Sequence, residues 1–257
     1  MKDQISALLA PFGEHGSFVW KDLVTGEGME WGAHTPHNAA SIIKIPVMVE
    51  LFRRFEDGTE CKDTLLPLRD CDRVPPCGVL TFMHEGMPVS LMDLCWLMIT
   101  ISDNMATNML INYLTVPAIQ ETMRALGLQN SMLERKLFET DPALRNKRNR
   151  ISAADMALLL EQMHRGELIS ERASREMLDV LSGQQLNNKI PFLLPLDMHI
   201  AHKTGEVDDV THDVGIIYAK RPQLVCFCSS DVDAPAFNQV IFTISKLIFD
   251  AAGGLVE

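Results

Sequence analysis

The sequence has no long apolar run. No stretch reaches the roughly 18 residues that a helix needs to cross a bilayer, because Lys44 and Asp93 interrupt the most hydrophobic stretches. The first 16 residues carry Asp3 and only a brief apolar patch, with no small-residue cleavage pattern behind it. We therefore expect a short amphipathic helix in place of a signal peptide, no contact with a membrane, and a location in the cytoplasm.

The sequence has fewer basic than acidic residues. The 257 residues include 23 lysines and arginines against 34 aspartates and glutamates, which gives a net charge of -11. Such a balance argues against nucleic acid and anionic membranes as partners. Cations gathered at one site can still attract an anionic substrate, so the expected partner is a small molecule. The composition says nothing about the oligomeric state.

The sequence also lacks metal-binding patterns. None of its six cysteines forms a Cys-x-x-Cys or Cys/His spacing, so we expect no metal site and no cofactor. Two of them lie in a strand-like apolar run, which is typical of reduced thiols in a core. The six are Cys61, Cys71, Cys77, Cys95, Cys226 and Cys228.

The chain does have enough apolar sequence, 47% of its residues, for a sizeable core in one large domain or two intertwined ones. Turn residues and periodicity predict helices and strands at both ends, with a helical block between them that does not clearly call for a sheet. The expected helices are 1–12 and 237–252, with the helical block over 41–183; the expected strands are 17–24, 29–33, 199–203, 213–220 and 223–229.

This order of elements predicts an α+β protein. We expect the two termini to build one α/β sheet subdomain from residues 1–44 and 190–257, with residues 45–189 as a helical subdomain. Sites usually form where such units meet, so we expect the active site at their junction.

Three short strings indicate what that site contains. They are Ser41-Ile42-Ile43-Lys44, Ser102-Asp103-Asn104 and Lys203-Thr204-Gly205. Each string alone is close to what chance gives, but the ordered set indicates a serine site for acyl transfer. The simpler alternative is that the strings are an ordinary helix start, a turn and a strand end.

The first string pairs a nucleophile with its base. Three residues apart on a helix, Ser41 and Lys44 share one face with Cβ atoms about 5–6 Å apart, and a serine needs a base to take its proton. Pro46 favours a helix that begins near Ser41, where the positive end of the helix dipole favours negative charge. Lys44 can act as a base only when it is neutral, which burial and the second cation Lys203 promote.

The other two strings supply proton transfer and binding. Ser102 can relay a proton towards a leaving nitrogen, and the Asn104 amide can bind a substrate carbonyl together with Lys44. The hydroxyl of Thr204, next to a lysine, can meet a substrate carboxylate, while Gly205 leaves room for close approach.

Two histidines lie beside the third string. His202 precedes it directly and suits packing better than catalysis. His212-Asp213 comes just before an expected strand, where a solvated strand end is a better interpretation than substrate contact.

With these residues in place, the chain resembles the class A β-lactamase family over most of its length. The stretches NAASIIKIPVMVELF and LMITISDNMATNMLI look like the family's nucleophile helix and Ser-Asp-Asn region, and RNRISAADMALLL looks like the end of its omega loop. HKTG and VGIIYAK look like its active-site strand pair. The resemblance implies the serine β-lactamase and penicillin-binding-protein fold, with an antiparallel sheet flanked by terminal helices. It also implies an oxyanion hole formed by the backbone N–H groups of Ser41 and Glu206.

The chain departs from the family pattern where the acyl-enzyme should be hydrolysed. Class A enzymes carry the deacylating glutamate in a Glu-x-x-Leu-Asn string, which residues 128–155 do not contain. The nearby acids are Glu134, Glu139 and Asp141. We select Glu139 as the candidate base because it lies 37 residues after Ser102 in a segment apolar enough to turn a carboxylate inward. Asp141 comes second, and the alternative is that both are solvated loop charges.

Two further features of the family are missing. Val214 takes the place of an arginine that often binds the substrate carboxylate, and Met48 and Cys95 take the places of a disulfide pair that some members carry, so that bridge cannot form.

By this resemblance the residues for acylation are complete, whereas no family motif identifies the deacylation base. The resemblance therefore implies a serine hydrolase that opens a β-lactam or a related amide or ester through a Ser41 acyl-enzyme, and it links the chain to antibiotic resistance. A penicillin-binding-type peptidase or esterase is one alternative. A sensor that is acylated without efficient turnover is another.

Overall fold

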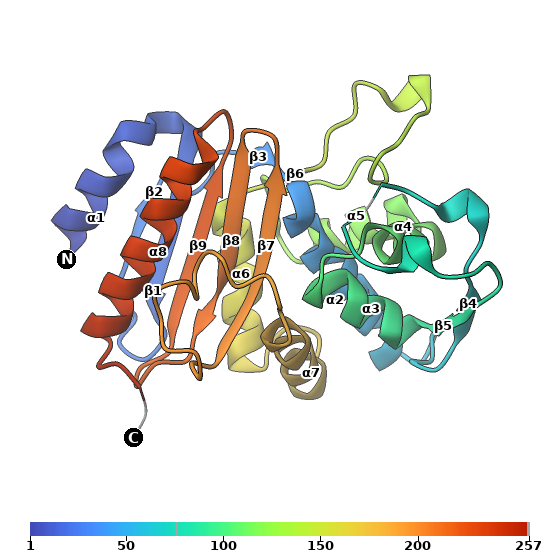
Figure 1. Ribbon diagram of the computed structural model, residues 1–257. Helices are drawn as coiled ribbons and strands as arrows, with labels where there is room; N and C mark the ends of the chain where they lie inside the picture. Colours follow the sequence, from blue (N-terminus) through green and yellow to red (C-terminus); the bar gives the residue numbers. More distant parts are fainter. Residues whose placement is uncertain (76, 256–257) are drawn as a thin grey trace.

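Five antiparallel strands form the main sheet. In the computed structural model, which describes residues 1–75 and 77–255, the strands follow the order β2-β1-β9-β8-β7 (Figure 1). The α+β class and the antiparallel sheet are thereby confirmed. The strands are β1 (Gly16–Asp22), β2 (Gly28–Trp31), β7 (Ile200–Val207), β8 (Val210–Ile217) and β9 (Gln223–Ser229).

The strand β7 runs further than the sequence predicted. We expected it to end at Lys203, whereas it continues to Val207 because it pairs with β8 along its whole length, down to Val207 opposite Val210. The Lys203-Thr204-Gly205 string is therefore inside a strand at the edge of the sheet, facing the helical block. The predicted strand 223–229 is confirmed in both its ends.

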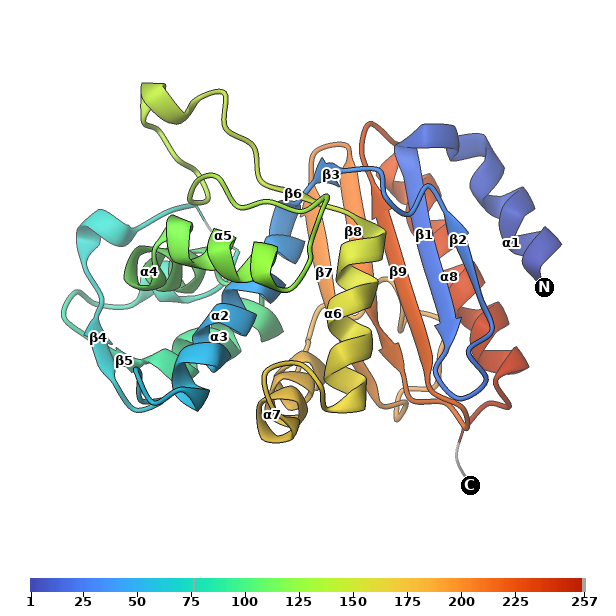
Figure 2. The same ribbon diagram turned by 180° about the vertical axis from the view of Figure 1, so that it is seen from behind.

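Helices cover both faces of this sheet. α1 (Lys2–Leu9) and α8 (Ala234–Ala251) pack on one face, and α6 (Ala153–Arg165) packs on the other (Figures 1 and 2). Every residue of β8 and β9 is accordingly buried, as in other sheets covered on both faces. The sequence placed residues 153–165 in the helical subdomain, whereas this helix lies on the sheet. The division of the chain near residues 44 and 190 stays a prediction.

The other helices stand beside the β7 edge, around a central helix. Nine consecutive residues of that helix, from Lys44 to Phe52, are buried, which is typical of a helix surrounded on all sides. The helices are the central α2 (Lys44–Glu56) and its neighbours α3 (Leu91–Thr100), α4 (Asn104–Leu114), α5 (Val116–Ala125) and α7 (Glu171–Ser182).

Two short strand pairs involve residues 41–183, a stretch whose sequence does not clearly call for a sheet. β4 (Leu65–Pro67) pairs with β5 (Pro88–Ser90), and β3 (His37–Asn38) pairs with β6 (Arg150–Ile151). With two or three residues each, these strands are too short to show an alternating pattern in the sequence. The β3-β6 pair matters for the site because it fastens the chain just before Ser41.

The helix α4 begins where a buried carboxylate caps it. The Asp103 side chain accepts hydrogen bonds from Ala106 N at 2.9 Å, and from Val79 N and Leu80 N at 2.6 and 2.9 Å. It therefore accepts a free N–H group at the helix start. It also holds the loop of Val79 and Leu80 against this helix. Gly78 (φ +97°) lies so close that a Cβ there would meet Asp103 Oδ2 at 2.1 Å. This cap positions Ser102 and Asn104 on either side of it.

The six thiols are free, as predicted. Cys95, Cys226 and Cys228 are buried, and burial raises the pKa of each well above its usual range. Within the described residues, none of the helices combines the length and the apolar character needed to cross a membrane.

Candidate active site

Ser41 lies where a tight turn meets the central helix. The chain leaves β3, passes through a 3-10 turn over Ala40–Ile43 and enters α2 at Lys44. We predicted a helix beginning near Ser41, and its first turn is 3-10, entered through Ala40 in the left-handed region at φ 40°. The tight turn still brings the Ser41 hydroxyl within 3.0 Å of the Lys44 amine.

Lys44 is buried among four oxygen atoms. Its Nζ lies 3.0 Å from Ser41 Oγ, 2.9 Å from Ser102 Oγ, 2.8 Å from Ser102 O and 3.0 Å from Asn104 Oδ1. Burial lowers the pKa of Lys44 to about 7, so a large fraction is neutral near that pH. A neutral amine has two N–H groups and one lone pair. Since the two carbonyl oxygens can only accept, they take the N–H groups, and the lone pair is left for a hydroxyl proton.

Ser102 connects Lys44 to a second buried lysine. Lys203 Nζ lies 3.2 Å from Ser102 Oγ and donates to Thr204 O at 2.8 Å. Burial and then the charge of Lys44 hold the pKa of Lys203 well below its usual range. Ser102 itself has a φ of 57°, a left-handed conformation that costs energy outside glycine. The strained residue places one hydroxyl between two amines, as a proton relay requires.

Gly205 allows β7 to pass beneath the turn that carries the nucleophile. A Cβ at this position would lie 3.1 Å from Ile42 Cγ1 and 3.0 Å from His212 Cδ2. We expected the close approach here to involve substrate. In the structure, parts of the protein already approach this position closely, so Gly205 sets the distance between Ser41 and the β7 strand. The approach of substrate to Gly205 stays a prediction.

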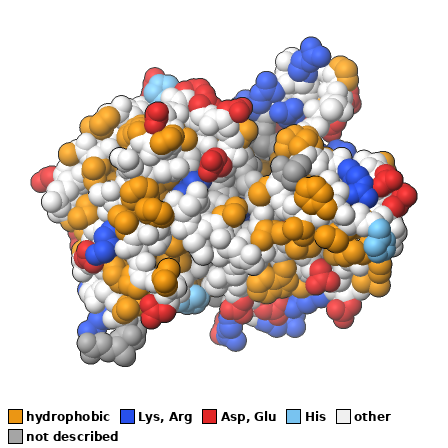
Figure 3. All heavy atoms as spheres, in the orientation of Figure 1, with side chains coloured by type: hydrophobic (Ala, Val, Ile, Leu, Met, Phe, Trp, Pro, Cys, Tyr) orange, Lys and Arg blue, Asp and Glu red, His pale blue; other side chains and the backbone are white. Residues whose placement is uncertain are grey.

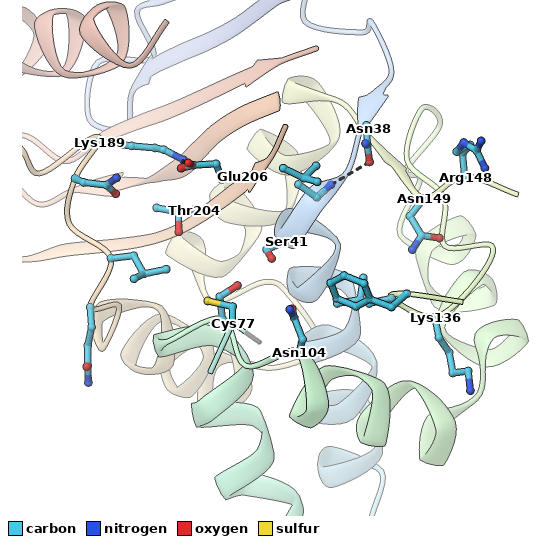
Figure 4. A pocket seen from close by; sticks show the side chains of 18 of the residues that line it. Asn38, Ser41, Cys77, Asn104, Lys136, Arg148, Asn149, Lys189, Thr204 and Glu206 are labelled. Carbon is cyan, nitrogen blue, oxygen red and sulfur yellow. Dashed lines mark hydrogen bonds and ion pairs between the residues drawn. The ribbon is translucent and has the colours of Figure 1, made fainter. Parts of the chain in front are cut away.

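A cavity of about 900 Å³ opens over Ser41 (Figure 4). It lies between β7 on one side and the loop of residues 129–150 on the other. Of the residues predicted from the sequence, five line it, while Lys44 and Lys203 are buried behind its wall. The five are Ser41, Ser102, Asn104, Thr204 and Glu206.

The comparison with known families agrees with this geometry. Residues 1–252 match the family model described as the beta-lactamase enzyme family. The chain belongs to this family. A beta-lactamase from Rhodobacter capsulatus is 32% identical over 155 residues, which are 58% of this chain. The match covers 52% of that protein, so it spans about half of the relative's length.

Solved structures agree on the fold. A beta-lactamase from Sphaerobacter thermophilus DSM 20745 is 28% identical, with a TM-score of 0.90 over 98% of both chains. A variant of PBP-A, solved as an acyl-enzyme complex with penicillin G, is 25% identical, with a TM-score of 0.87 over 97% of this chain and 95% of that one. This chain therefore has the serine β-lactamase fold, as the sequence resemblance implied.

Among the described residues, none of the three loop acids considered for deacylation, Glu134, Glu139 and Asp141, lines the cavity. The Glu139 carboxylate accepts hydrogen bonds from Thr140 N and Asp141 N of its own loop, at 3.0 and 3.1 Å, and it does not line the cavity. Glu134 accepts from Lys147 Nζ and Arg148 N. Among the described residues, the only carboxylate that lines the cavity is that of Glu206. The choice of Glu139 as deacylation base stays a prediction.

Sequence reasoning missed Lys189. This lysine is 1% exposed and lines the cavity. Its Nζ donates to Gly205 O at 3.2 Å and His212 O at 3.3 Å, and pairs with Glu206 Oε2 at 3.1 Å. The residue stands in a connection without helical or alternating pattern, so only the folded chain brings it to the strand that carries Thr204.

His212 is buried, which corrects our interpretation of a solvated strand end. Its Nδ1 accepts the backbone N–H of Ser229 at 3.1 Å. The proton must therefore be on Nε2, which donates to Asn38 O at 2.8 Å. Burial lowers the pKa of His212 to about 3, so the ring is neutral at ordinary pH. It holds the segment before Ser41 against β8.

His202, a buried residue of β7, contacts neighbouring side chains, as the packing role expected for it implies. Its Nδ1 lies 2.9 Å from Asp213 Oδ1, and its Nε2 lies 3.0 Å from Asn187 Oδ1. Asp213 is fully buried as well, so neither member of the His212-Asp213 pair is solvated.

Proposed function

We propose that the protein hydrolyses a β-lactam, or a related amide or ester, through an acyl-enzyme on Ser41. The observation that carries this proposal is the arrangement around Lys44. A buried amine whose two N–H groups face carbonyl oxygens has its lone pair directed to hydroxyls, 3.0 Å from Ser41 Oγ. Such a contact between a nucleophile and a base is the requirement for covalent catalysis by serine.

The proton can follow one closed route. Lys44 accepts the Ser41 proton as Oγ attacks the carbonyl carbon, and the backbone N–H groups of Ser41 and Glu206 are the proposed donors to the resulting oxyanion. When the C–N bond breaks, Ser102 gives its proton to the leaving nitrogen and takes one from Lys44 at 2.9 Å. The products of this half-reaction are an ester on Ser41 and a neutral Lys44.

Three side chains are proposed to orient the substrate. The Asn104 Nδ2 donates one N–H to Pro75 O at 3.1 Å, and its second N–H remains for the carbonyl group of the acyl side chain. Thr204 and the neighbouring Lys203 are the proposed partners of the carboxylate on the other side. The acyl-enzyme complex of the PBP-A variant with penicillin G supports a β-lactam as the acylating compound.

Intact mass tests the acylation step. After exposure to a β-lactam, the wild-type protein should carry one adduct on Ser41, and Ser41→Ala should carry none. Full labelling of the Ser41→Ala variant would refute the assignment. Steady-state turnover of a chromogenic β-lactam would establish a hydrolase, whereas a single stoichiometric burst would favour the acylated sensor or a slow penicillin-binding-type enzyme.

The same assay tests the deacylation base. If Glu139 has this role, Glu139→Gln should acylate normally and accumulate a long-lived adduct. Unchanged turnover in Glu139→Gln would remove the residue from the mechanism. A cytoplasmic location and a contribution to antibiotic resistance also stay predictions.

A further inference from the structure

The charge on the cavity wall is opposite to that of the whole chain. Four cationic residues line the cavity, Arg135, Lys136, Arg148 and Lys189, against one carboxylate, Glu206. The chain as a whole has a net charge of -11. Since Lys189 and Glu206 form an ion pair at 3.1 Å, the other three cations account for the excess.

Those three cations lie together on the loop side of the site. In Figure 4, Lys136 and Arg148 stand on one side of Ser41, with their charged ends pointing in different directions, while Thr204 and Lys189 stand on the other side. Figure 3 shows lysine and arginine side chains gathered on the projecting loop that carries residues 129–150. A substrate attached to Ser41 would thus have one end towards β7 and the other towards these cations.

The loop does not neutralise its own cations. Among the described residues, no Asp or Glu oxygen pairs with the charged ends of Arg135, Lys136 or Arg148. The Glu134 carboxylate accepts the backbone N–H of Arg148 at 3.0 Å and pairs with Lys147, which does not line the cavity. The Arg148 guanidinium contacts only the carbonyl oxygens of Arg145 and Lys147. Three like charges along one cavity wall make the electrostatic potential there positive, which favours an anionic group on the substrate.

We propose that the loop wall formed by Arg135, Lys136 and Arg148 binds an anionic group at the far end of the substrate's acyl side chain. The inference rests on the proposed function, because it assumes acylation of Ser41. It narrows the substrate class to acyl compounds with two anionic groups, one held near Thr204 and the other by the loop wall. Charge-assisted hydrogen bonds from guanidinium groups would fix the second one.

A matched pair of penicillins tests this directly. Both carry a six-carbon acyl side chain, which ends in a carboxylate in one (adipoyl) and in the isosteric carboxamide in the other. Intact mass follows the acylation of Ser41 and gives a second-order rate constant for each compound. The quantity compared is the rate constant of the carboxylate compound divided by that of the carboxamide compound. In the variant with Arg135→Gln, Lys136→Gln and Arg148→Gln together, the ratio should fall on the order of tenfold, the scale of a charge-assisted contact.

Two controls make the result specific. Arg145→Gln removes a charge from the same loop at a residue that does not line the cavity, and it should leave the ratio at the wild-type value. In the wild-type protein the ratio should fall as salt rises, because salt screens exposed charges. A ratio that is insensitive to salt and to the triple substitution, or that falls equally in Arg145→Gln, would overturn the inference. If neither penicillin acylates Ser41, the proposed function itself fails.

Discussion

At the scale of single residues, the protonation of Lys44 decides when the site can react. Its ammonium form has no lone pair, and burial lowers its pKa to about 7. The base is therefore increasingly available as the pH rises through that value. The two carbonyl oxygens accept N–H groups from Lys44 in either form, so in the neutral form the lone pair is left to face a hydroxyl.

We therefore expect the acylation rate to rise with pH through a midpoint near 7 and to level off above it. Lys44→Ala should lose this dependence and acylate about two to four orders of magnitude more slowly, the scale for a missing general base. Rapid mixing with a β-lactam across the pH range measures both effects. An acylation rate that falls as the pH rises through 7 would assign the base to another group. So would the same rise of the rate with pH in Lys44→Ala.

The single tautomer of His212 allows a second test on this scale. His212→Asn keeps an acceptor for Ser229 N but loses the donor to Asn38 O, whereas His212→Gln can keep a donor near the Nε2 position. We expect acylation to be slower in His212→Asn than in His212→Gln, by about tenfold for one buried hydrogen bond. If the two variants are equally stable and also acylate at equal rates, His212 only supports the fold.

At the scale of elements, the start of α4 is more than a helix cap. Asp103 receives one N–H from its own helix and two from the loop of Val79 and Leu80. Ser90 offers a simple comparison, because it caps α3 by one hydrogen bond to Asp93 N at 3.0 Å. The Asp103 contacts join the loop to the helix that carries Asn104, so they also position the site.

Asp103→Ala should accordingly destabilise the protein more than Ser90→Ala does. We expect Ser90→Ala to cost about 1 kcal/mol, the usual value of a cap. Asp103→Ala should cost roughly 2–4 kcal/mol, because it also leaves N–H groups of the loop without an acceptor. Urea unfolding of the two variants gives the comparison. Equal losses would mean that the loop contacts contribute nothing.

At the scale of the whole molecule, one core joins the sheet to the helical block. A single cluster of buried side chains contains Val19, Val214 and Cys226 from the sheet together with Met48 and Leu110 from the helices. A second cluster lies between the sheet and α1 and α8. Because the first cluster is shared, neither unit can lose its packing without exposing apolar surface of the other.

We therefore expect a single cooperative unfolding transition. Calorimetry should give equal calorimetric and van't Hoff enthalpies. Two variants, each with a single tryptophan, report on the two parts: Trp20 on the sheet and Trp96 on α3. The fluorescence of both should change at the same temperature. Two separated transitions would instead support independent subdomains divided near residues 44 and 190.

The sequence by itself determined the class of fold, most helices and strands, and the identity of the chemistry. Ser41 and Lys44 are three residues apart, so local helical geometry alone brings them together. The order of the three strings then indicated which distant residues belong to the same site. These features depend on short-range periodicity and on side-chain chemistry, both of which are visible in the sequence.

Only the tertiary structure decided the rest. Lys203 meets Ser102 across 101 positions. Lys189 and the loop cations Arg135, Lys136 and Arg148 come to line the cavity without any local pattern in the sequence that predicts it. His212 likewise reaches Asn38 O from a distant strand. The two-residue strands β3 and β6 exist because the folded chain supplies partners for their backbone groups. Burial, which lowers the pKa of both active-site lysines, is likewise a property of the packed molecule.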